Sequence, residues 1–376
     1  MNFEPYFKQY LEAYAKTTDP LWNYETGLVA MGARDLYEIT GDESYLQAVI
    51  SHMDFFITPD GAIRTLDTRD ENLDRINAGK ILFYLYKKTG EERYRTAIET
   101  LMEMLRRHPR TSTGNFWHKR IYPYQIWLDG LYMALPFYLE YETTYNQKEN
   151  YNDIFFQMTH VRKIMYNKNT HLYIHAYDEK KIMPWADPQT GLSHNYWLRA
   201  VGWHLMALID LHEICSLEVF EQHKQYADWF KEAIQGVLKY QDPELKLFYQ
   251  LMVLPSLEGN YLETSGSAMI AYSILKGCRL GVLNMEKYRP IGEEILKALE
   301  EQKLQLQGGK WYLTDICSVA GLGPANQRDG SIAYYLSEPI VSDDMKGTGA
   351  AMLAYAEWLK LKKADETLKP SKEESR

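Results

Sequence analysis

An aspartate inside an apolar stretch is the first candidate for chemistry in this sequence of 376 residues. Asp129 stands in QIWLDGLYMALPFYLE, residues 125–140, where nearly every neighbour is apolar and a glycine follows directly. Burial in such surroundings favours the neutral carboxyl, so we expect a raised pKa for Asp129 and a role as general acid. The structural alternative is an aspartate that caps or orients the neighbouring backbone.

A second aspartate occupies the corresponding place in the preceding apolar helix. Asp74 stands in NLDRINAGK, near the expected start of that helix. Two carboxyl groups on adjacent helices are the minimal set for glycoside hydrolysis. The sequence equally allows Asp74 to be a helix N-cap. It does not give the separation of the two carboxyl groups, so the stereochemical outcome of such a reaction stays open.

A tryptophan–arginine motif follows in NYWLRAVGW, residues 195–203. Trp197 and Arg199 lie near an expected helix start, and Arg199 and Trp203 share one helix face at i, i+4 spacing. Tryptophans offer stacking surfaces, and a guanidinium binds carboxylates through paired hydrogen bonds. We interpret the motif as a carboxylate clamp. The alternative is a core tryptophan pair with an arginine that reaches toward solvent.

Two histidines and a lysine lie in the long connections between the expected helices. His118 and Lys119 belong to FWHKRIYPY, and His175 belongs to HLYIHAYD. Loop histidines are often only solvated. The sequence has no His-Glu-x-x-His motif and no cysteine cluster, so we expect no metal. It also has no glycine-rich phosphate loop and no G-x-S-x-G motif, so we expect neither a nucleotide cofactor nor a serine nucleophile of that type.

The elements that must position these residues form a helical repeat. Two long segments, 23–56 and 72–105, both run from a polar start through a small-residue helix to a TG stop. Each then restarts with acidic residues and continues as an amphipathic helix. Gly41 and Gly90 fit helix C-caps, and the acids that follow them fit the next helix N-terminus.

The alternation continues to the end of the chain. Apolar helices are expected near 22–38, 72–88, 123–142, 195–214, 262–280 and 343–360, and helices with a charged face near 3–16, 43–56, 91–107, 148–166, 219–239 and 285–303. Six inner and six outer helices predict one all-α domain over residues 1–376, a closed (α/α)6 barrel, with a flexible tail at 364–376. An open solenoid is the alternative, but it would need polar capping repeats, which the last apolar helix does not resemble.

A closed barrel brings the polar starts of its inner helices to one mouth. These segments are WNYE, ENLD, QIWLD, NYWLRAVGW, YLETSGS and SDDMKGTG, and they are rich in Trp, Asp, Glu, Arg and Lys. Each alone is compatible with a helix cap or a solvated loop. Together they predict the lining of a pocket.

Composition and charge exclude several functional classes. The net charge is −9 without a basic run, which argues against nucleic-acid binding. No apolar run approaches the roughly 20 residues of a membrane span, and the N-terminal residues do not form a secretory signal. Cys215, Cys278 and Cys317 are odd in number and lack metal-ligand spacing, which fits buried thiols in the cytoplasm. The 30 Tyr and 9 Trp suit clefts for polar rings, although helical cores also use them.

The motifs together resemble a known family. QIWLDGLYMALPFYLEY, WADPQTGLSHNYWLRAVGWHLMALIDL and SEPIVSDDMKGTGAAMLAYAEWL are similar to glycoside hydrolase family 105, the unsaturated rhamnogalacturonyl hydrolases. The resemblance spans nearly the whole chain, from WNYETGL to the final inner helix. The combination of WLDGLYM with WLRAVGW is specific, because the sister family of unsaturated glucuronyl hydrolases shares the barrel and only part of the pattern.

The resemblance implies an (α/α)6 barrel without metal that acts in the cytoplasm on lyase-generated pectin fragments. In this family an aspartic acid protonates C4 of the C4=C5 double bond of the terminal uronic acid, and water adds at C5. The hemiketal then opens and releases the neighbouring sugar. Asp129 matches the acid/base position, and Asp74 matches a second active-site aspartate. The expected substrate-binding residues are Tyr24, His118, Lys119, Trp127, Met133, His175, Trp197, Arg199, Trp203 and Lys346.

Three alternatives remain at this point. An unsaturated glucuronyl hydrolase would have the same fold and a different leaving sugar. A non-catalytic binding or scaffold protein would leave the six polar segments unrelated to one another. A sugar epimerase on the same barrel would use a histidine pair, such as His118 and His175. The expected partner is an unsaturated oligosaccharide, with no nucleic acid and no membrane, and the expected assembly is a monomer or a weak homo-oligomer.

Overall fold

The computed structural model describes residues 1–16, 20–323 and 328–368. The inner helices of this part of the chain are α2 (Tyr24–Thr40), α4 (Lys80–Thr89), α6 (Leu128–Thr144), α8 (Leu198–Ile214), α10 (Thr264–Arg279) and α13 (Met345–Leu368). The outer helices are α1 (Glu4–Tyr14), α3 (Glu43–Phe56), α5 (Glu92–Arg107), α7 (Tyr151–Met165), α9 (Phe220–Val237) and α11 (Met285–Lys303). A short additional helix is α12 (Ile332–Ser337).

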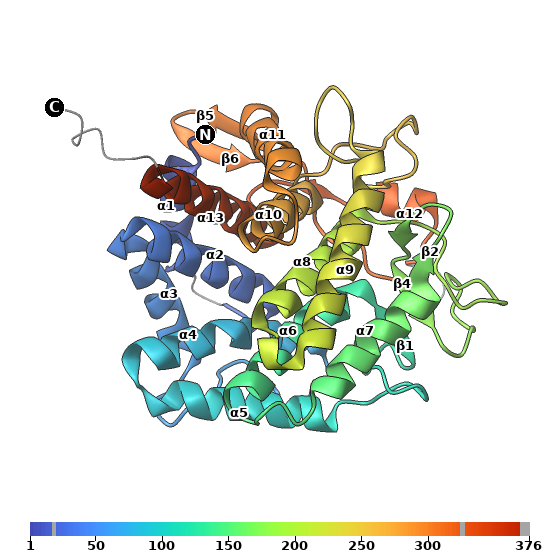
Figure 1. The fold of residues 1–376 in the computed structure, drawn as a ribbon, viewed down its shortest axis with the longest axis horizontal. Coiled ribbons are helices and arrows are strands. Elements are labelled where there is room, and N and C mark those ends of the chain that lie inside the picture. Colours follow the sequence, from blue (N-terminus) through green and yellow to red (C-terminus); the bar gives the residue numbers. More distant parts are fainter. Residues whose placement is uncertain (17–19, 324–327, 369–376) are drawn as a thin grey trace.

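The inner helices close into a ring. Helix α2 contacts α4, and the turns that precede α4 contact α6. Helix α6 contacts α8, α8 contacts α10, α10 contacts α13, and α13 runs alongside the first helix, α2 (Figure 1). The seam depends on glycine: a Cβ added at Gly32 would lie 2.6 Å from the Cβ of Met352, and one at Gly349 would lie 2.8 Å from Cγ of Leu28. The predicted (α/α)6 barrel is therefore confirmed, and the open solenoid is wrong.

Burial explains why the two kinds of helix alternate. In α8 every residue from Leu198 to His212 is buried, whereas α5 buries its apolar face and leaves its charged residues exposed or half-buried. A helix buried all round belongs inside the ring, and an amphipathic helix belongs on its outside. The predicted C-caps are also confirmed: Gly41 and Gly90 have φ values of 71° and 72°, and their N–H groups donate to Tyr37 and Tyr86.

The starts of several inner helices differ from the predicted ones. The helix expected from residue 72 begins as two 3₁₀ turns, η1 (Leu73–Arg75) and η2 (Asn77–Gly79), and becomes α-helical only at Lys80. Residues 125–127, expected to be helical, form strand β1 (Gln125–Trp127). Asp129 therefore lies in the first turn of α6, not in the middle of a helix. The difference arises because strand pairing with a distant segment of the same chain holds these residues extended. Helical periodicity in the sequence does not reveal such pairing.

Within the described residues, the chain also forms four short antiparallel strand pairs. They are β1 with β4 (Ala176–Asp178), β2 (Tyr166–Asn167) with β3 (Leu172–Tyr173), β5 (Leu304–Gln307) with β6 (Lys310–Leu313), and β7 (Ile316–Cys317) with β8 (Ile340–Val341). They lie in the connections between helices. The sequence analysis predicted none of them, because each is too short to show a period-two pattern.

The remaining expectations concern the chain end, the cysteines and membranes. Helix α13 continues to Leu368, so residues 364–368 of the expected flexible tail are helical, and residues 369–376 lie outside the described residues. Cys215, Cys278 and Cys317 are unpaired and buried, as predicted. Within the described residues, no helix combines the length and the apolar character that crossing a membrane requires.

Candidate active site

The starts of the inner helices meet at one end of the barrel, which we call the N-terminal end. Asp129 and Arg199 lie in the first turns of α6 and α8, and Asp74 lies in η1. Tyr24, the first residue of α2, is close to all three: burial raises its pKa well above the usual value, the charges of Asp74 and Asp129 add to this, and Arg199 opposes it. Four polar segments distant in sequence thus share one neighbourhood.

Strand pairing places His175 opposite Asp129. In the β1–β4 pair Trp127 faces Ala176, and the N–H of Leu128 donates to the carbonyl of His175 at 3.1 Å. The side chain of His175 then reaches the first turn of α6, where its Nε2 lies 3.3 Å from Oδ2 of Asp129. His175 is fully buried, so the interpretation of a solvated loop histidine is wrong.

The facing atoms of this pair are unsatisfied. Asp129 Oδ2 and His175 Nε2 are buried, and neither has a hydrogen-bond partner of good geometry among the described residues. Buried polar atoms without partners are rare in folded proteins and mark places where a ligand or water completes the bonding. Both atoms therefore retain hydrogen-bonding capacity beyond their mutual contact at 3.3 Å.

The pKa of Asp129 differs in direction from the prediction. Burial raises it, as expected, but the neighbouring His175, with a smaller contribution from His118, outweighs burial and lowers the pKa below its ordinary value. The expectation of a raised pKa was wrong because the sequence did not show that a histidine 46 positions later would face this carboxylate. In the free protein Asp129 is ionised at neutral pH.

A tyrosine that the sequence analysis missed holds the other side of His175. The hydroxyl of Tyr335, on α12, lies 2.7 Å from Nδ1 of His175. Tyr335 is itself fully buried, and its carbonyl accepts a hydrogen bond of 2.6 Å from Gln250. A hydroxyl at Nδ1 fixes the ring orientation and determines which nitrogen faces Asp129. Nothing in the local sequence, SIAYYLSEP, distinguishes Tyr335 from Tyr334 beside it.

Asp74 belongs to a second charged pair. Its Oδ2 lies 2.5 Å from Nζ of Lys119, and its Oδ1 lies 4.0 Å from Nε2 of His118. The N-cap of η1 is Asn72, whose side chain accepts from the N–H of Asp74, so the capping interpretation of Asp74 is wrong. Burial lowers the pKa of Lys119, but the charge of Asp74 outweighs it and raises that pKa.

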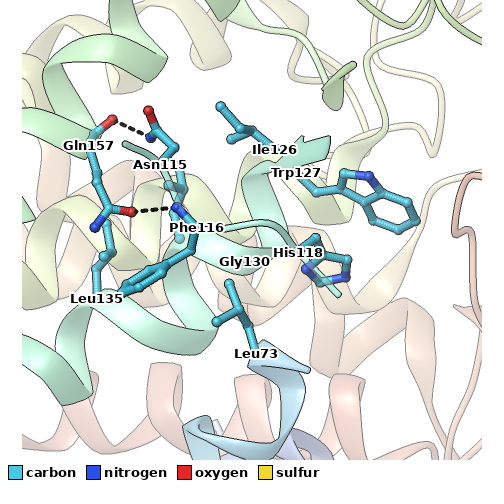
Figure 2. Close-up of a pocket in the computed structure, with 10 residues that line it drawn as sticks. Leu73, Asn115, Phe116, His118, Ile126, Trp127, Gly130, Leu135 and Gln157 are labelled. Carbon is cyan, nitrogen blue, oxygen red and sulfur yellow. Dashed lines mark hydrogen bonds between the residues drawn. The ribbon is translucent and has the colours of Figure 1, made fainter. Parts of the chain in front are cut away.

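His118 is held between an aromatic ring and a small cavity. Its ring stacks on Trp127, with centroids 4.5 Å apart, and Trp127 stacks on Tyr122 at 4.8 Å. His118 also lines a cavity of about 10 Å³, which is at the lower limit for one water molecule. Figure 2 shows His118 and Gly130 side by side at this cavity. A Cβ at Gly130 would approach Nδ1 of His118 to 3.1 Å, which explains the glycine after Asp129.

Burial also governs the protonation of His118. Its pKa lies well below the usual value, because burial and the neighbouring charge of Lys119 both disfavour the imidazolium. His118 is only 3% exposed and is therefore not a solvated loop residue. At neutral pH the ring is neutral.

Arg199 is placed near the site but is not a free clamp. Its guanidinium donates to Ser265 Oγ at 3.2 Å, to the carbonyl of Cys317, and to the carbonyl of Ser318 at 3.2 Å. It also lies over the ring of Trp197, 4.7 Å from the centroid. These bonds occupy the two terminal nitrogens, and the residue is 1% exposed. Arg199 thus joins α8 to α10 and to the segment after β7.

The remaining predicted residues divide into ring contacts and a paired lysine. Trp203 stacks on Tyr132, with centroids 4.9 Å apart, and meets the edge of Tyr24 at 5.9 Å. Met133 is buried one turn beyond Asp129 on α6. Lys346 bonds Glu25 at 2.7 Å and Asp344 at 2.9 Å, so two carboxylates already neutralise it.

Two further observations bear on the chemistry at the N-terminal end of the barrel. Among the residues that the structure describes, no group of three His, Cys, Asp or Glu side chains could hold a metal ion. Glu263, which the sequence analysis did not single out, is fully buried and caps α10 by accepting from Ser265 and Gly266. It also accepts from the N–H of Cys317 at 3.1 Å, so its role is to hold the backbone around Arg199.

Comparisons with known proteins place the chain among carbohydrate-active enzymes. The profile of Glycosyl Hydrolase Family 88 matches residues 4–362. A solved family 105 glycoside hydrolase from C. acetobutylicum ATCC 824 is 40% identical, with a TM-score of 0.91 over 96% of this chain and 100% of that one. Protein Atu3128 of Agrobacterium fabrum is 40% identical over 235 residues, 61% of this chain and 99% of that protein. The unsaturated rhamnogalacturonyl hydrolase YesR of Bacillus subtilis is 27% identical over 290 residues, 75% of this chain and 78% of that protein.

Proposed function

The chain belongs to Glycosyl Hydrolase Family 88, within the group of unsaturated uronyl hydrolases that includes family 105, and we propose that it is an unsaturated rhamnogalacturonyl hydrolase. Its substrate would be a lyase-generated pectin fragment with a C4=C5 double bond in the terminal galacturonic acid. The products would be the hydrated uronate, which no longer has the double bond, and a rhamnose-ended sugar.

One observation carries the proposal: the facing atoms of Asp129 and His175 are buried and unsatisfied beside the rings of Trp127 and Trp197. The ring of His175 lies 5.6 Å from that of Trp127 and 5.0 Å from that of Trp197, measured between centroids. A sugar ring packed against these indoles would present its double bond to the carboxyl of Asp129.

In the proposed reaction Asp129 is the acid. It transfers a proton to C4, positive charge develops at C5, and water adds there and returns a proton to the carboxylate. The hemiketal at C5 then opens, and the neighbouring sugar leaves. Because Asp129 is ionised in the free protein, it must gain its proton when substrate binds. The uronate charge and the exclusion of water both raise the pKa of a nearby carboxyl, so substrate binding supplies that change.

The roles of the groups around Asp129 are assigned from the atoms that each group faces. We assign the Tyr335 hydroxyl as the donor to Nδ1 of His175, 2.7 Å away, which places the imidazole proton on Nε2, toward Asp129. We assign the uronate to Lys119, because a single carboxylate, that of Asp74, pairs with it, whereas Lys346 pairs with two carboxylates and Arg199 donates to three protein acceptors. Asp74 then orients Lys119 and the sugar hydroxyls.

The name of the Bacillus subtilis relative and the WLDGLYM and WLRAVGW motifs support a rhamnogalacturonan substrate over a glucuronyl one. The convergence of the polar segments disfavours a non-catalytic scaffold, and the partnering of each histidine with a carboxylate disfavours an epimerase histidine pair. The three unpaired cysteines fit use in the cytoplasm.

The test follows the ultraviolet absorbance of the unsaturated uronate. Purified protein receives Δ4,5-galacturonyl-rhamnose and, separately, a Δ4,5-glucuronyl disaccharide, with the Asp129→Asn variant as control. Loss of absorbance with release of rhamnose is expected for the first substrate in the wild type only. Turnover of the second substrate alone would assign the glucuronyl reaction instead. Absorbance unchanged with both substrates, in folded protein, would refute the double-bond chemistry.

A further inference from the structure

A large cavity lined by charged, aromatic and apolar side chains lies at the opposite end of the barrel, where the inner helices finish, and we call this the C-terminal end. Its volume is about 1050 Å³, and residues from all six inner helices line it. Small-molecule sites typically measure a few hundred to about 1000 Å³. None of the residues assigned to the candidate active site lines this cavity.

Most charged groups of this cavity are paired with one another. Lys276 bonds Asp210 at 2.7 Å, Glu213 at 2.6 Å and the hydroxyl of Tyr272 at 2.8 Å. Arg279 bonds Glu213 at 2.9 Å, and Lys360 bonds Asp35 at 2.7 Å. Such pairs are a sufficient structural explanation for these side chains.

Lys80 differs from these paired groups. It is 8% exposed, and its Nζ has no hydrogen-bond partner among the described residues. Its Nζ lies 4.0 Å from Oδ2 of Asp210, a long ion pair, and 3.7 Å from the centroid of the Tyr132 ring. Burial lowers the pKa of Lys80 to about 7, although Asp210 opposes the shift.

The helix dipole does not explain Lys80 either. Cations are favourable in the last turn of a helix, where Lys276 and Arg279 stand in α10. Lys80 is the first residue of α4, at the positive end of that helix. Three effects therefore destabilise Lys80: its charge is buried, it lies at the positive end of a helix dipole, and its Nζ lacks a hydrogen bond. An acceptor that is not part of the protein would remove the last of these.

The cavity wall also suits a sugar ring. Tyr84, Tyr86, Tyr132, Tyr145 and Tyr272 contribute aromatic faces or hydroxyl groups. Glu140 lies in the same wall, and burial raises its pKa, which favours a protonated carboxyl able to donate to a hydroxyl or an anion.

We propose that the cavity at the C-terminal end is a second ligand site, which binds a small sugar acid with its carboxylate against Lys80 and its ring among the tyrosines. This site is separate from the proposed reaction and stands whether or not that reaction is confirmed. Ring contacts connect the two ends: Lys80 covers one side of Tyr132, Tyr132 stacks on Trp203, and Trp203 meets Tyr24.

The test is isothermal titration with D-galacturonate as the probe, at about pH 6 and about pH 9. The Lys80→Met variant keeps the buried stem and removes the ammonium. We expect its affinity to be at least about tenfold weaker at the lower pH, as for loss of a charged hydrogen bond. The matched control is Lys87→Met, an exposed lysine at the rim of the same cavity, with an expected change below about twofold.

Three comparisons make the result decisive. D-Galactose, which lacks the charge, should not bind at Lys80, and inorganic phosphate, which lacks the ring, should bind more weakly than galacturonate. Wild-type affinity should fall as pH rises through about 7, because the ammonium is lost there. This pH series also serves if Lys80→Met does not fold. Equal binding by both lysine variants, tighter binding of phosphate, or pH-independent binding in the wild type would overturn the proposal.

Discussion

The two ends of the barrel are made from the same six helices and differ in charge at several of the helix termini. At the N-terminal end the first turns of α2 and α6 hold Glu25 and Asp129. At the C-terminal end the last turns of α4 and α10 hold lysines and Arg279. The helix dipole favours this distribution, so charge type alone does not identify a functional site at either end.

The informative groups are those with buried polar atoms that make no hydrogen bond of good geometry to the described residues. At the N-terminal end they are Asp129 Oδ2 and His175 Nε2, and at the C-terminal end the corresponding atom is Lys80 Nζ. Arg199 and Lys346 lie at the N-terminal end with their bonding satisfied. The comparison teaches that satisfied charges hold the ring together and unsatisfied ones await a ligand. Four substitutions test this distinction.

The largest effect is expected for Asp129→Asn. An amide cannot deliver the proton to C4, so the rate should fall by about 10³-fold or more, measured as loss of ultraviolet absorbance of the unsaturated uronate. Circular dichroism and binding of intact substrate should remain close to wild type. A folded Asn variant with a rate within about tenfold of wild type would remove Asp129 from the acid role.

Arg199→Lys should mainly reduce stability. Lysine cannot donate at once to Ser265 and to the carbonyls of Cys317 and Ser318, so buried acceptors are left unpaired. We expect a loss of about 2 kcal/mol in the free energy of unfolding, measured by urea denaturation. Unchanged stability with a raised KM for the uronate would instead restore Arg199 as a substrate clamp.

Tyr335→Phe tests how His175 is positioned. Loss of the hydroxyl leaves Nδ1 unbonded and frees the choice of tautomer, so kcat should fall about tenfold with little change in KM. The pH profile of kcat should also move, which a purely structural role would not cause. Tyr334→Phe is the matched control, because the Tyr334 hydroxyl bonds the carbonyl of Gly321 and Glu338. Equal effects from both variants would contradict the positioning role.

Lys80→Met gives the smallest expected effect, a gain of about 1 kcal/mol in the free energy of unfolding. Below pH 7 wild-type Lys80 is charged in both the folded and the unfolded chain, and the folded chain bears the full cost of burying it. Between pH 7 and 10.5 the unfolded chain keeps a proton that the folded one has released, so wild-type stability rises with pH.

The advantage of Lys80→Met should therefore be greatest below pH 7 and shrink between pH 7 and 10.5, as measured by urea denaturation across this range. Lys87→Met, exposed to solvent, should show no such trend. A variant less stable than wild type at about pH 6 would mean that Lys80 holds the fold together and awaits no ligand.

Particular elements show which parts of the fold could be predicted from the sequence. Apolar and amphipathic helices alternate with a period that needs no tertiary information, so the ring, its closure and the caps at Gly41 and Gly90 could be predicted. The helix start at Asp129 could not, because pairing of β1 with β4 decides it across about 50 residues. The two 3₁₀ turns before Lys80 were missed for the same reason, since both pack against α6 and the second also packs against α2.

By itself, the sequence determined the helical alternation, the six polar segments and the candidate pair Asp129 and Asp74, because these depend on side-chain type and spacing along one chain. Only the tertiary structure decided the direction of the pKa shift of Asp129, the bond of Tyr335 to His175 and the isolation of Lys80. Each of these depends on groups far apart in sequence that lie within a few ångströms in the fold, and at such distances charge and hydrogen bonding outweigh the local preference that a sequence records.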